Sequence, residues 1–126
     1  MIVPFIKSVS SSDLNLWGEN PSDPFDVYLG IEVEIGERNH EAADLFQFVV
    51  ATPKGLDRHS GMLNSAIIRD RSVLVICQYD ASTVREWLDE TVRSCQAEDW
   101  VTCVAHLQRY FRWEYESMQM SEEKER

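Results

Sequence analysis

The stretch Phe25–Ile35, FDVYLGIEVEI, decides the expected fold of this chain. Every second side chain in it is apolar, namely Phe25, Val27, Leu29, Ile31, Val33 and Ile35. Successive side chains of a β-strand point to opposite faces, so the alternation predicts an antiparallel strand with one face buried and the other in water. The water-facing side chains include Asp26, Glu32 and Glu34, which gives the exposed face a negative charge.

Three other apolar runs are expected to join this strand in a sheet. Residues 2–9 (IVPFIKSV) predict an opening strand, although Pro4 is tolerated only at a sheet edge or near a strand end. Residues 45–52 (LFQFVVAT) predict the second arm of a hairpin. Residues 72–79 (SVLVICQY) are almost continuously apolar and rich in β-branched side chains, which favours a strand covered on both faces.

Beyond Tyr79 the apolar period becomes helical. One helix is predicted where apolar residues recur at intervals of three and four, with Asp80 or Ser82 as its cap; these residues are Val84, Trp87, Leu88, Val92 and Cys95. A second helix is predicted from about Asp99, with one stripe that runs from Trp100 through Leu107 and Phe111 to Glu114 or Tyr115.

This order of elements predicts an α+β fold, in which an antiparallel sheet of about four strands carries two C-terminal helices packed on one face. Residues 54–71 have no clean period, and we expect a loop there with no more than one helical turn. We expect residues 1–116 to form a single domain, because 126 residues suffice for one hydrophobic core. The polar tail, residues 117–126, is expected to fray.

Charge is the unusual quantity in the composition. The chain has 12 Lys and Arg residues against 22 Asp and Glu residues, a formal net charge of −10. Between Lys7 and Lys54 there are nine acidic residues and one basic residue, Arg38. Nucleic acids and anionic membranes are therefore not expected as partners, because both would be repelled.

The expected compartment is the cytoplasm. The chain shows no apolar membrane-spanning run and no secretory signal. Its three cysteines have no CxxC spacing, so we expect them to be buried and inert.

The chemistry of an enzyme is not evident in the sequence. A glycine-rich phosphate loop, a GxSxG elbow, an HExxH pair and a CxxC pair are all missing. We therefore expect no catalytic residues, no metal and no cofactor. Two alternatives stay open at this point: a small hydrolase built around His40 or His59, with or without a metal, and an acidic adaptor whose charge serves solubility alone.

The acidic segment between Lys7 and Lys54, which we call the acidic block, can be interpreted as a docking surface for a basic partner. An acidic patch would speed the encounter with such a partner, and a tyrosine would supply an amphipathic anchor. The residues expected to form this surface are Asp26, Tyr28, Glu32, Glu34, Glu37 and Glu41.

The order of several short motifs resembles the bacterial immunity protein 8 family. The motifs are Ile35-Gly36, FQFVVATP at Phe46–Pro53, Leu56, Tyr79-Asp80, Asp99-Trp100 and LQRYFRWEYE at Leu107–Glu116. The Trp113-Glu114 pair is the most distinctive of them. The resemblance covers most of the chain.

This resemblance implies a cytoplasmic antidote that binds a cognate toxin domain and blocks it stoichiometrically. The acidic surface adds the expectation that the toxin is basic and is a nuclease. Trp113 and Glu114 match the family motif, and we expect both to be structural, with the tryptophan packed under the sheet and the glutamate bound to nearby backbone or arginine groups. The sequence leaves homo-oligomerisation open.

Overall fold

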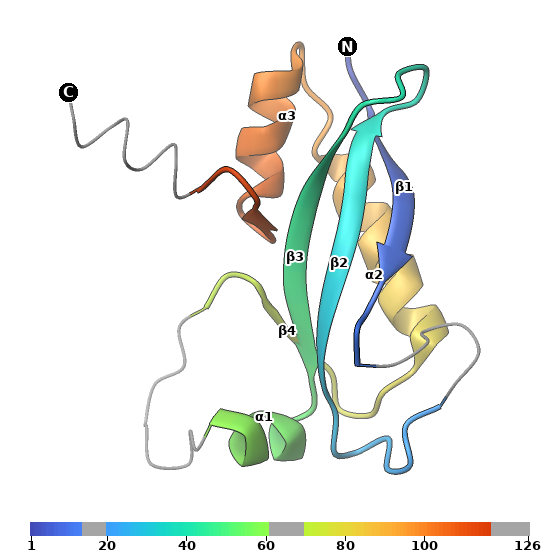
Figure 1. Cartoon of the computed structure of the whole chain (residues 1–126), viewed down its shortest axis with the longest axis vertical. Helices are drawn as coiled ribbons and strands as arrows, with labels where there is room; N and C mark the ends of the chain where they lie inside the picture. The colour runs from blue at the N-terminus through green and yellow to red at the C-terminus, as the bar shows by residue number, and fades with distance from the viewer. Residues whose placement is uncertain (14–19, 61–69, 117–126) are drawn as a thin grey trace, which may run out of the picture.

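A computed structural model describes residues 1–13, 20–60 and 70–116 of the chain (Figure 1). It has the predicted α+β fold. The strands are β1 (Pro4–Ser10), β2 (Tyr28–Glu37), β3 (Ala43–Ala51), β4 (Val73–Val75) and β5 (Arg112–Trp113). The helices are α1 (Pro53–Ser60), α2 (Ala81–Ser94) and α3 (Trp100–Leu107).

The strands form one sheet in the order β1-β2-β3-β4, and β5 also pairs with β3. The predicted hairpin is confirmed, since β2 and β3 are antiparallel neighbours with Glu32 opposite Gln47. β1 is antiparallel to β2, with an irregularity in the register between Ile6 and Ser8. β4 runs parallel to β3, so the sheet is mixed but mostly antiparallel. The predicted antiparallel pairing holds for β1, β2, β3 and β5 and does not extend to β4.

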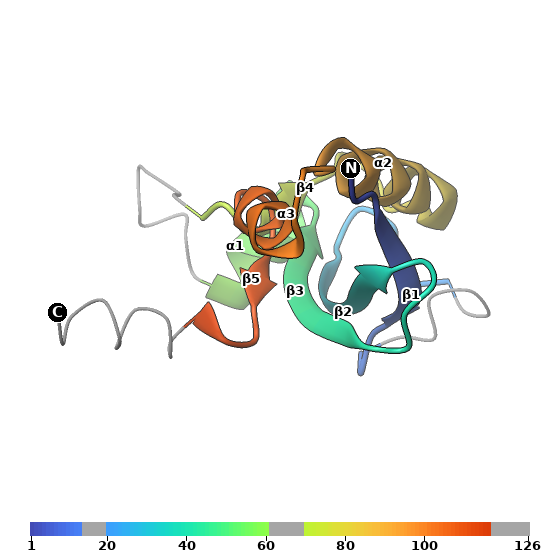
Figure 2. The ribbon, with the colours of Figure 1, turned by 90° about the horizontal axis from the view of Figure 1, so that it is seen from above.

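The core lies between one face of the sheet and the two helices α2 and α3. The alternating apolar residues of β2 are buried, from Leu29 to Ile35. α2 covers them with Val84, Leu88 and Val92, and α3 adds Val104 and Leu107. Figure 2 shows both helices on the same side of the curved sheet, as predicted. The opposite face of the sheet is therefore available to solvent along β2.

Two aspartates begin these helices as the sequence predicts. The Asp80 carboxylate accepts hydrogen bonds from the Ser82 and Thr83 N–H groups at the start of α2, and Asp99 accepts one from the Thr102 N–H at the start of α3. The Ser82 hydroxyl also donates to Asp80 and is the main cause that holds the pKa of Asp80 below its ordinary value. These bonds satisfy backbone donors that a helix leaves unpaired.

The central strand begins later than predicted. Phe25 is 53% exposed, although the alternation placed it in the core. Its N–H donates to the Asp23 carboxylate at 2.9 Å, and the Asp26 N–H donates to the Asp23 carbonyl at 3.1 Å. These bonds form a turn, so the chain enters β2 only at Tyr28.

The apolar run at residues 72–79 does not form a strand covered on both faces. Only Val73–Val75 pairs with β3, and Val75 is 54% exposed. The Ile76 N–H still donates to the Ala51 carbonyl at the end of β3. Beyond Ile76 the chain leaves the sheet, and the Tyr79 N–H donates to the Pro24 carbonyl in the segment before β2. Cys77 lies in this exit and is exposed, so its predicted burial is wrong, whereas the predicted burial of Cys95 and Cys103 is confirmed.

The last predicted helix is too long. α3 ends at Leu107, and a turn leads to β5, which pairs with β3 opposite Phe46 and Gln47. Phe111 is nevertheless fully buried, because the turn returns it to the core. The irregular segment contains α1, which is longer than the single turn expected. The tail at residues 117–126 lies outside the part of the chain that the structure describes.

Candidate functional site

The face of the sheet opposite α2 and α3 carries an acidic surface. Side chains paired directly across the strands share a face, so the register places Ser8, Ser10, Gln47 and Val49 beside the outward side chains of β2. We call this surface the acidic face, and its members are Ser8, Ser10, Tyr28, Gly30, Glu32, Glu34, Gln47 and Val49.

Glu32 and Glu34 are the charged centre of the acidic face. Both are exposed and stand two residues apart on β2, a spacing of about 6.6–6.8 Å in a strand. The Ser8 hydroxyl donates to the Glu34 carboxylate at 2.9 Å. Among the residues that the structure describes, neither glutamate forms an ion pair with Lys, Arg or His. Their negative charge is therefore not neutralised by any side chain of residues 1–13, 20–60 or 70–116.

Asp26 and Tyr28, also predicted for the site, are engaged by α1. The Arg58 guanidinium lies 2.8 Å from the Asp26 carboxylate, whose side chain is only 21% exposed. The His59 ring stacks on the Tyr28 ring with centroids 3.7 Å apart. α1 thus brings basic residues from outside the acidic block to this end of the sheet, so part of the charge counted along the sequence is compensated.

Glu37 and Glu41 lie at the other end of the hairpin. Glu37 is the last residue of β2 and pairs with Pro4, and by alternation it is on the opposite face from Glu32 and Glu34. Its carboxylate is 3.8 Å from the His40 ring. Glu41 is exposed in the turn between β2 and β3. The structure therefore brings Glu32, Glu34 and Tyr28 together on one face of β2, whereas Asp26 lies in the turn before β2 and Glu37 and Glu41 lie at its other end.

A hollow of about 330 Å³ lies within the acidic face, over Gly30. Arg112 borders it, and its guanidinium is 3.3 Å from the Asp70 carboxylate and donates to the Ser72 hydroxyl at 3.1 Å. The Ser72 hydroxyl, Ser72 N–H and Arg112 together hold the pKa of Asp70 below its ordinary value, with the hydroxyl as the main cause. The lining residues are Ser12, Tyr28, Gly30, Ile31, Glu32, Gln47, Phe48, Val49, Asp70, Ser72 and Arg112.

The sequence did not predict this hollow. In the sequence, Gly30 is one outward position of an alternating strand, and nothing beside it indicates a hollow. The other polar residues of the hollow, Asp70, Ser72 and Arg112, are at least 40 positions later in the chain. Only the pairing of β4 and β5 with β3 places them beside Gly30. No local motif in the sequence carries that information.

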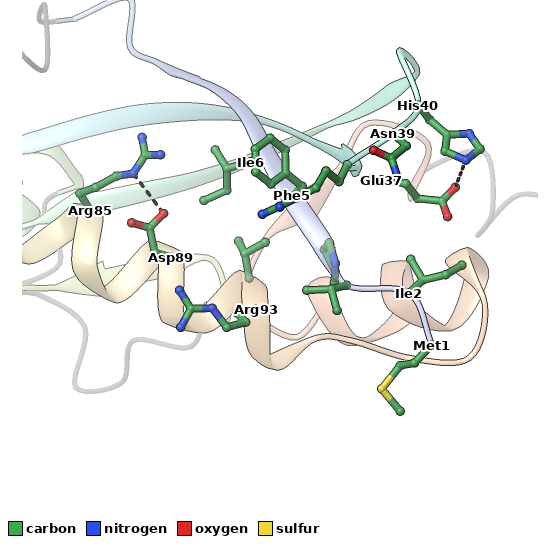
Figure 3. A pocket seen from close by; sticks show the side chains of 14 residues that line it. Met1, Ile2, Phe5, Ile6, Glu37, Asn39, His40, Arg85, Asp89 and Arg93 are labelled. Carbon is green, nitrogen blue, oxygen red and sulfur yellow. Dashed lines mark hydrogen bonds and ion pairs between the residues drawn. The ribbon is translucent and has the colours of Figure 1, made fainter.

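A second concave surface, of about 640 Å³, lies between β1 and α2. Figure 3 shows Arg85 joined to Asp89 on α2, Arg93 farther along the helix, and Phe5 and Ile6 on β1. The Arg85–Asp89 pair measures 3.1 Å. The third arginine of this surface, Arg38, lies over the Phe5 ring at 5.1 Å from its centroid. We call this surface the arginine groove.

The family-motif residues lie in and after β5. Trp113 packs against the core, and its indole N–H is buried without a hydrogen-bond acceptor among the described residues. The Glu114 carboxylate accepts a hydrogen bond from the Leu45 N–H at 3.0 Å, and the Glu114 N–H donates to the Leu45 carbonyl at 3.0 Å. Glu114 therefore continues the pairing of β5 with β3 through both its backbone and its side chain.

The histidines of the alternative hydrolase interpretation are dispersed. His40 is exposed at the hairpin turn near Glu37, whereas His59 is stacked on Tyr28 at the end of α1. Residues 1–13, 20–60 and 70–116 contain no group of three or more His, Cys, Asp or Glu side chains placed to hold a metal ion. No helix within these residues has the length and hydropathy needed to cross a membrane.

A comparison with protein-family models identifies a family for this chain. The family model described as Immunity protein 8 matches residues 5–118, which include all of β1 except Pro4, the acidic face, both core helices and β5. No curated protein and no solved structure matches the chain significantly. The match spans nearly the entire sequence, and on it the chain belongs to the immunity protein 8 family.

Proposed function

We propose that this protein is a cytoplasmic antidote that binds one cognate toxin domain stoichiometrically and blocks it without catalysis. Membership of an immunity protein family supports a toxin as the partner. The acidic face would be the contact surface, and the observation that carries this assignment is the exposed pair Glu32 and Glu34, which forms no ion pair within the described part of the chain.

The charge of this pair favours a basic toxin. Two like charges at neighbouring positions on one strand face repel each other, which slightly disfavours folding. A basic surface placed against them would remove that repulsion and would accelerate the encounter. A nuclease is the toxin class that we propose, because an active site that binds phosphates is itself positively charged.

The remaining predicted residues would take different parts in the contact. Tyr28, held by His59, would supply a rigid aromatic edge, and Asp26 would add less charge because Arg58 already neutralises it. Glu37 and Glu41 would extend the contact only if the toxin also reaches the hairpin turn. Trp113 and Glu114 would act through the fold, by fixing β5 to β3.

The test is a titration of the purified protein against the C-terminal domain of the product encoded immediately upstream, at low and moderate salt. We expect one-to-one binding that weakens as salt rises and that abolishes the toxicity of the domain. The variant Glu32→Lys with Glu34→Lys should slow association at low salt by about tenfold or more and reduce its salt dependence, while the fold stays intact.

A matched control is available on α2. Glu86 and Glu90 are also exposed, and Glu86→Lys with Glu90→Lys makes the same change in net charge away from the acidic face. If both variants slow association equally, net charge is the cause and the contact lies elsewhere. If the wild-type protein does not bind at either salt, the acidic adaptor becomes the better interpretation.

A further inference from the structure

We propose that the hollow over Gly30 is a preformed socket for one arginine side chain of the partner. This inference rests on the proposed function and names the chemistry by which the acidic face would recognise its toxin. The hollow, at about 330 Å³, falls at the lower end of the range for ligand pockets in proteins. One anchoring side chain is therefore the occupant that its size suits.

The floor of the socket includes Gly30, which has no side chain. Gly30 stands opposite Val49 in the register, and the next outward position of β2 is Tyr28, which lines the socket. Glycine inside a strand costs conformational entropy and packs nothing, and it often marks a site where another group approaches the backbone closely. Asp13 accepts a hydrogen bond from the Gly30 N–H at 3.1 Å, which fixes the backbone there.

The charges around the socket favour a cation at its Glu32 side. Asp70 is already neutralised by Arg112 on the far border. Glu32 has no cation among the described residues, so it is the lining carboxylate that lacks a counter-charge. Arg112 stands opposite Gln47, which in turn stands opposite Glu32. It would repel a second cation from its own border, so the incoming group is directed toward Glu32.

The aromatic wall favours arginine over lysine. A guanidinium is planar, stacks on aromatic rings and binds a carboxylate through two donors, whereas an ammonium is a compact point charge. Tyr28 is held by the His59 ring before any partner arrives, so binding does not incur the cost of ordering it. An apolar anchor would instead bury Glu32 without a partner, which is unfavourable.

The decisive variant is Gly30→Val, which fills the floor. A Cβ at position 30 would meet the Asp13 carboxylate at 3.7 Å, an ordinary contact, and the backbone there is open to any L-residue. Valine is also favoured in strands, so we expect the thermal stability to be unchanged or raised. The complex with the toxin domain should dissociate about tenfold faster or more, as expected for loss of an anchoring residue.

The matched control is Thr83→Val. Thr83 is exposed on α2, outside both the acidic face and the lining of the hollow. It receives the same side chain, and we expect less than a threefold change in dissociation rate by comparison. Equal effects of Thr83→Val and Gly30→Val, or no effect of either, would overturn the socket.

A second measurement needs no toxin. N-acetyl-arginine amide, titrated into the wild-type protein, should shift the backbone amide resonances of Gly30, Glu32 and Gln47 in a saturable way, and Gly30→Val should abolish the shifts. The norleucine analogue should cause none, and the lysine analogue should cause weaker ones. Equal shifts from the norleucine analogue, or none from arginine, would overturn the socket.

The two experiments separate the socket from the proposed function. If the toxin binds through Glu32 and Glu34 but neither Gly30→Val nor the arginine amide has an effect, the function stands and the socket is wrong. If the arginine amide binds at Gly30 but no toxin domain does, the socket stands and the proposed function is wrong.

Discussion

The acidic face and the arginine groove are two surfaces of the described part of the molecule that carry uncompensated charge of opposite sign. Glu32 and Glu34 form no ion pair among the described residues. In the groove, Arg85 pairs with Asp89, whereas Arg38 lies over the Phe5 ring and neither Arg38 nor Arg93 forms an ion pair with a described carboxylate. The groove is the larger of the two hollows, about 640 Å³ against about 330 Å³. The sign of the uncompensated charge, rather than the volume, therefore decides which of the two surfaces can steer a basic partner.

The largest effect is expected from Trp113, which helps to hold one border of the acidic face. Trp113 packs against the core next to Arg112, and the groove has no contact with β5 among its lining residues. Trp113→Ala should lower the free energy of unfolding by about 3 kcal/mol, the lower end of the range for truncating a packed tryptophan, because the side chain is half-buried. Urea unfolding measures this change.

Trp113→Phe is the control, since it keeps most of the packing and removes the indole N–H, which has no acceptor among the described residues. We expect it to cost much less than the alanine variant. If Trp113→Ala folds with unchanged stability but no longer protects against the toxin, the residue is a contact rather than a structural anchor, and the binding surface extends beyond the acidic face.

The antiparallel half of the sheet was predictable because its signal is local. The alternation in β2 and the polar turn before β3 determine both the burial and the pairing of these strands. β4 and β5 were missed or misassigned because three-residue and two-residue strands carry no period of their own. Tertiary pairing with β3 overrides the helical spacing that continues through Phe111 to Glu114.

Reversing two arginines of the arginine groove tests whether this surface contacts the toxin. Arg38→Glu with Arg93→Glu adds negative charge to a surface that we do not assign to the toxin. Association with a basic toxin domain at low salt should not slow, and it should accelerate by up to about threefold through long-range attraction. Stopped-flow mixing or surface binding kinetics gives this rate.

Arg38→Gln with Arg93→Gln serves as the intermediate charge state and should lie between the wild type and the reversal. A tenfold decrease in association rate for the glutamate variant would invert the comparison. The contact would then lie in the groove, and the partner would present acidic groups to it.

For the candidate site, the sequence predicted which acidic side chains are present but not which of them form ion pairs. Glu32 and Glu34 could be assigned to one exposed face from the alternation alone. The ion pair of Asp26 with Arg58 could not, because it joins residues 32 positions apart through a helix that has no clean sequence period. The place of Gly30 in a hollow could not be predicted either, because it depends on the sheet, which brings Asp70, Ser72 and Arg112 to the same hollow.

The smallest effect concerns α2, the helix that forms one wall of the groove. The Ser82 hydroxyl and the Thr83 and Ser82 N–H groups hold the pKa of Asp80 below its ordinary value of 3.8. A carboxylate whose pKa is lower in the folded state stabilises the fold at pH above the unfolded value, and this stabilisation is lost as pH falls through the folded pKa. The free energy of unfolding should therefore decrease below about pH 4.

Asp80→Asn isolates this contribution, because asparagine keeps an oxygen acceptor at the cap but does not titrate. The variant should unfold in urea with a flatter pH dependence than the wild type below about pH 4, and amide exchange should report the difference in the first turn of α2. Asp99→Asn tests the same principle on α3, outside the groove. If only the Asp99 variant flattened the pH profile, the cap of α2 would contribute little, and the wall of the groove would depend on the packing of Val84, Leu88 and Val92.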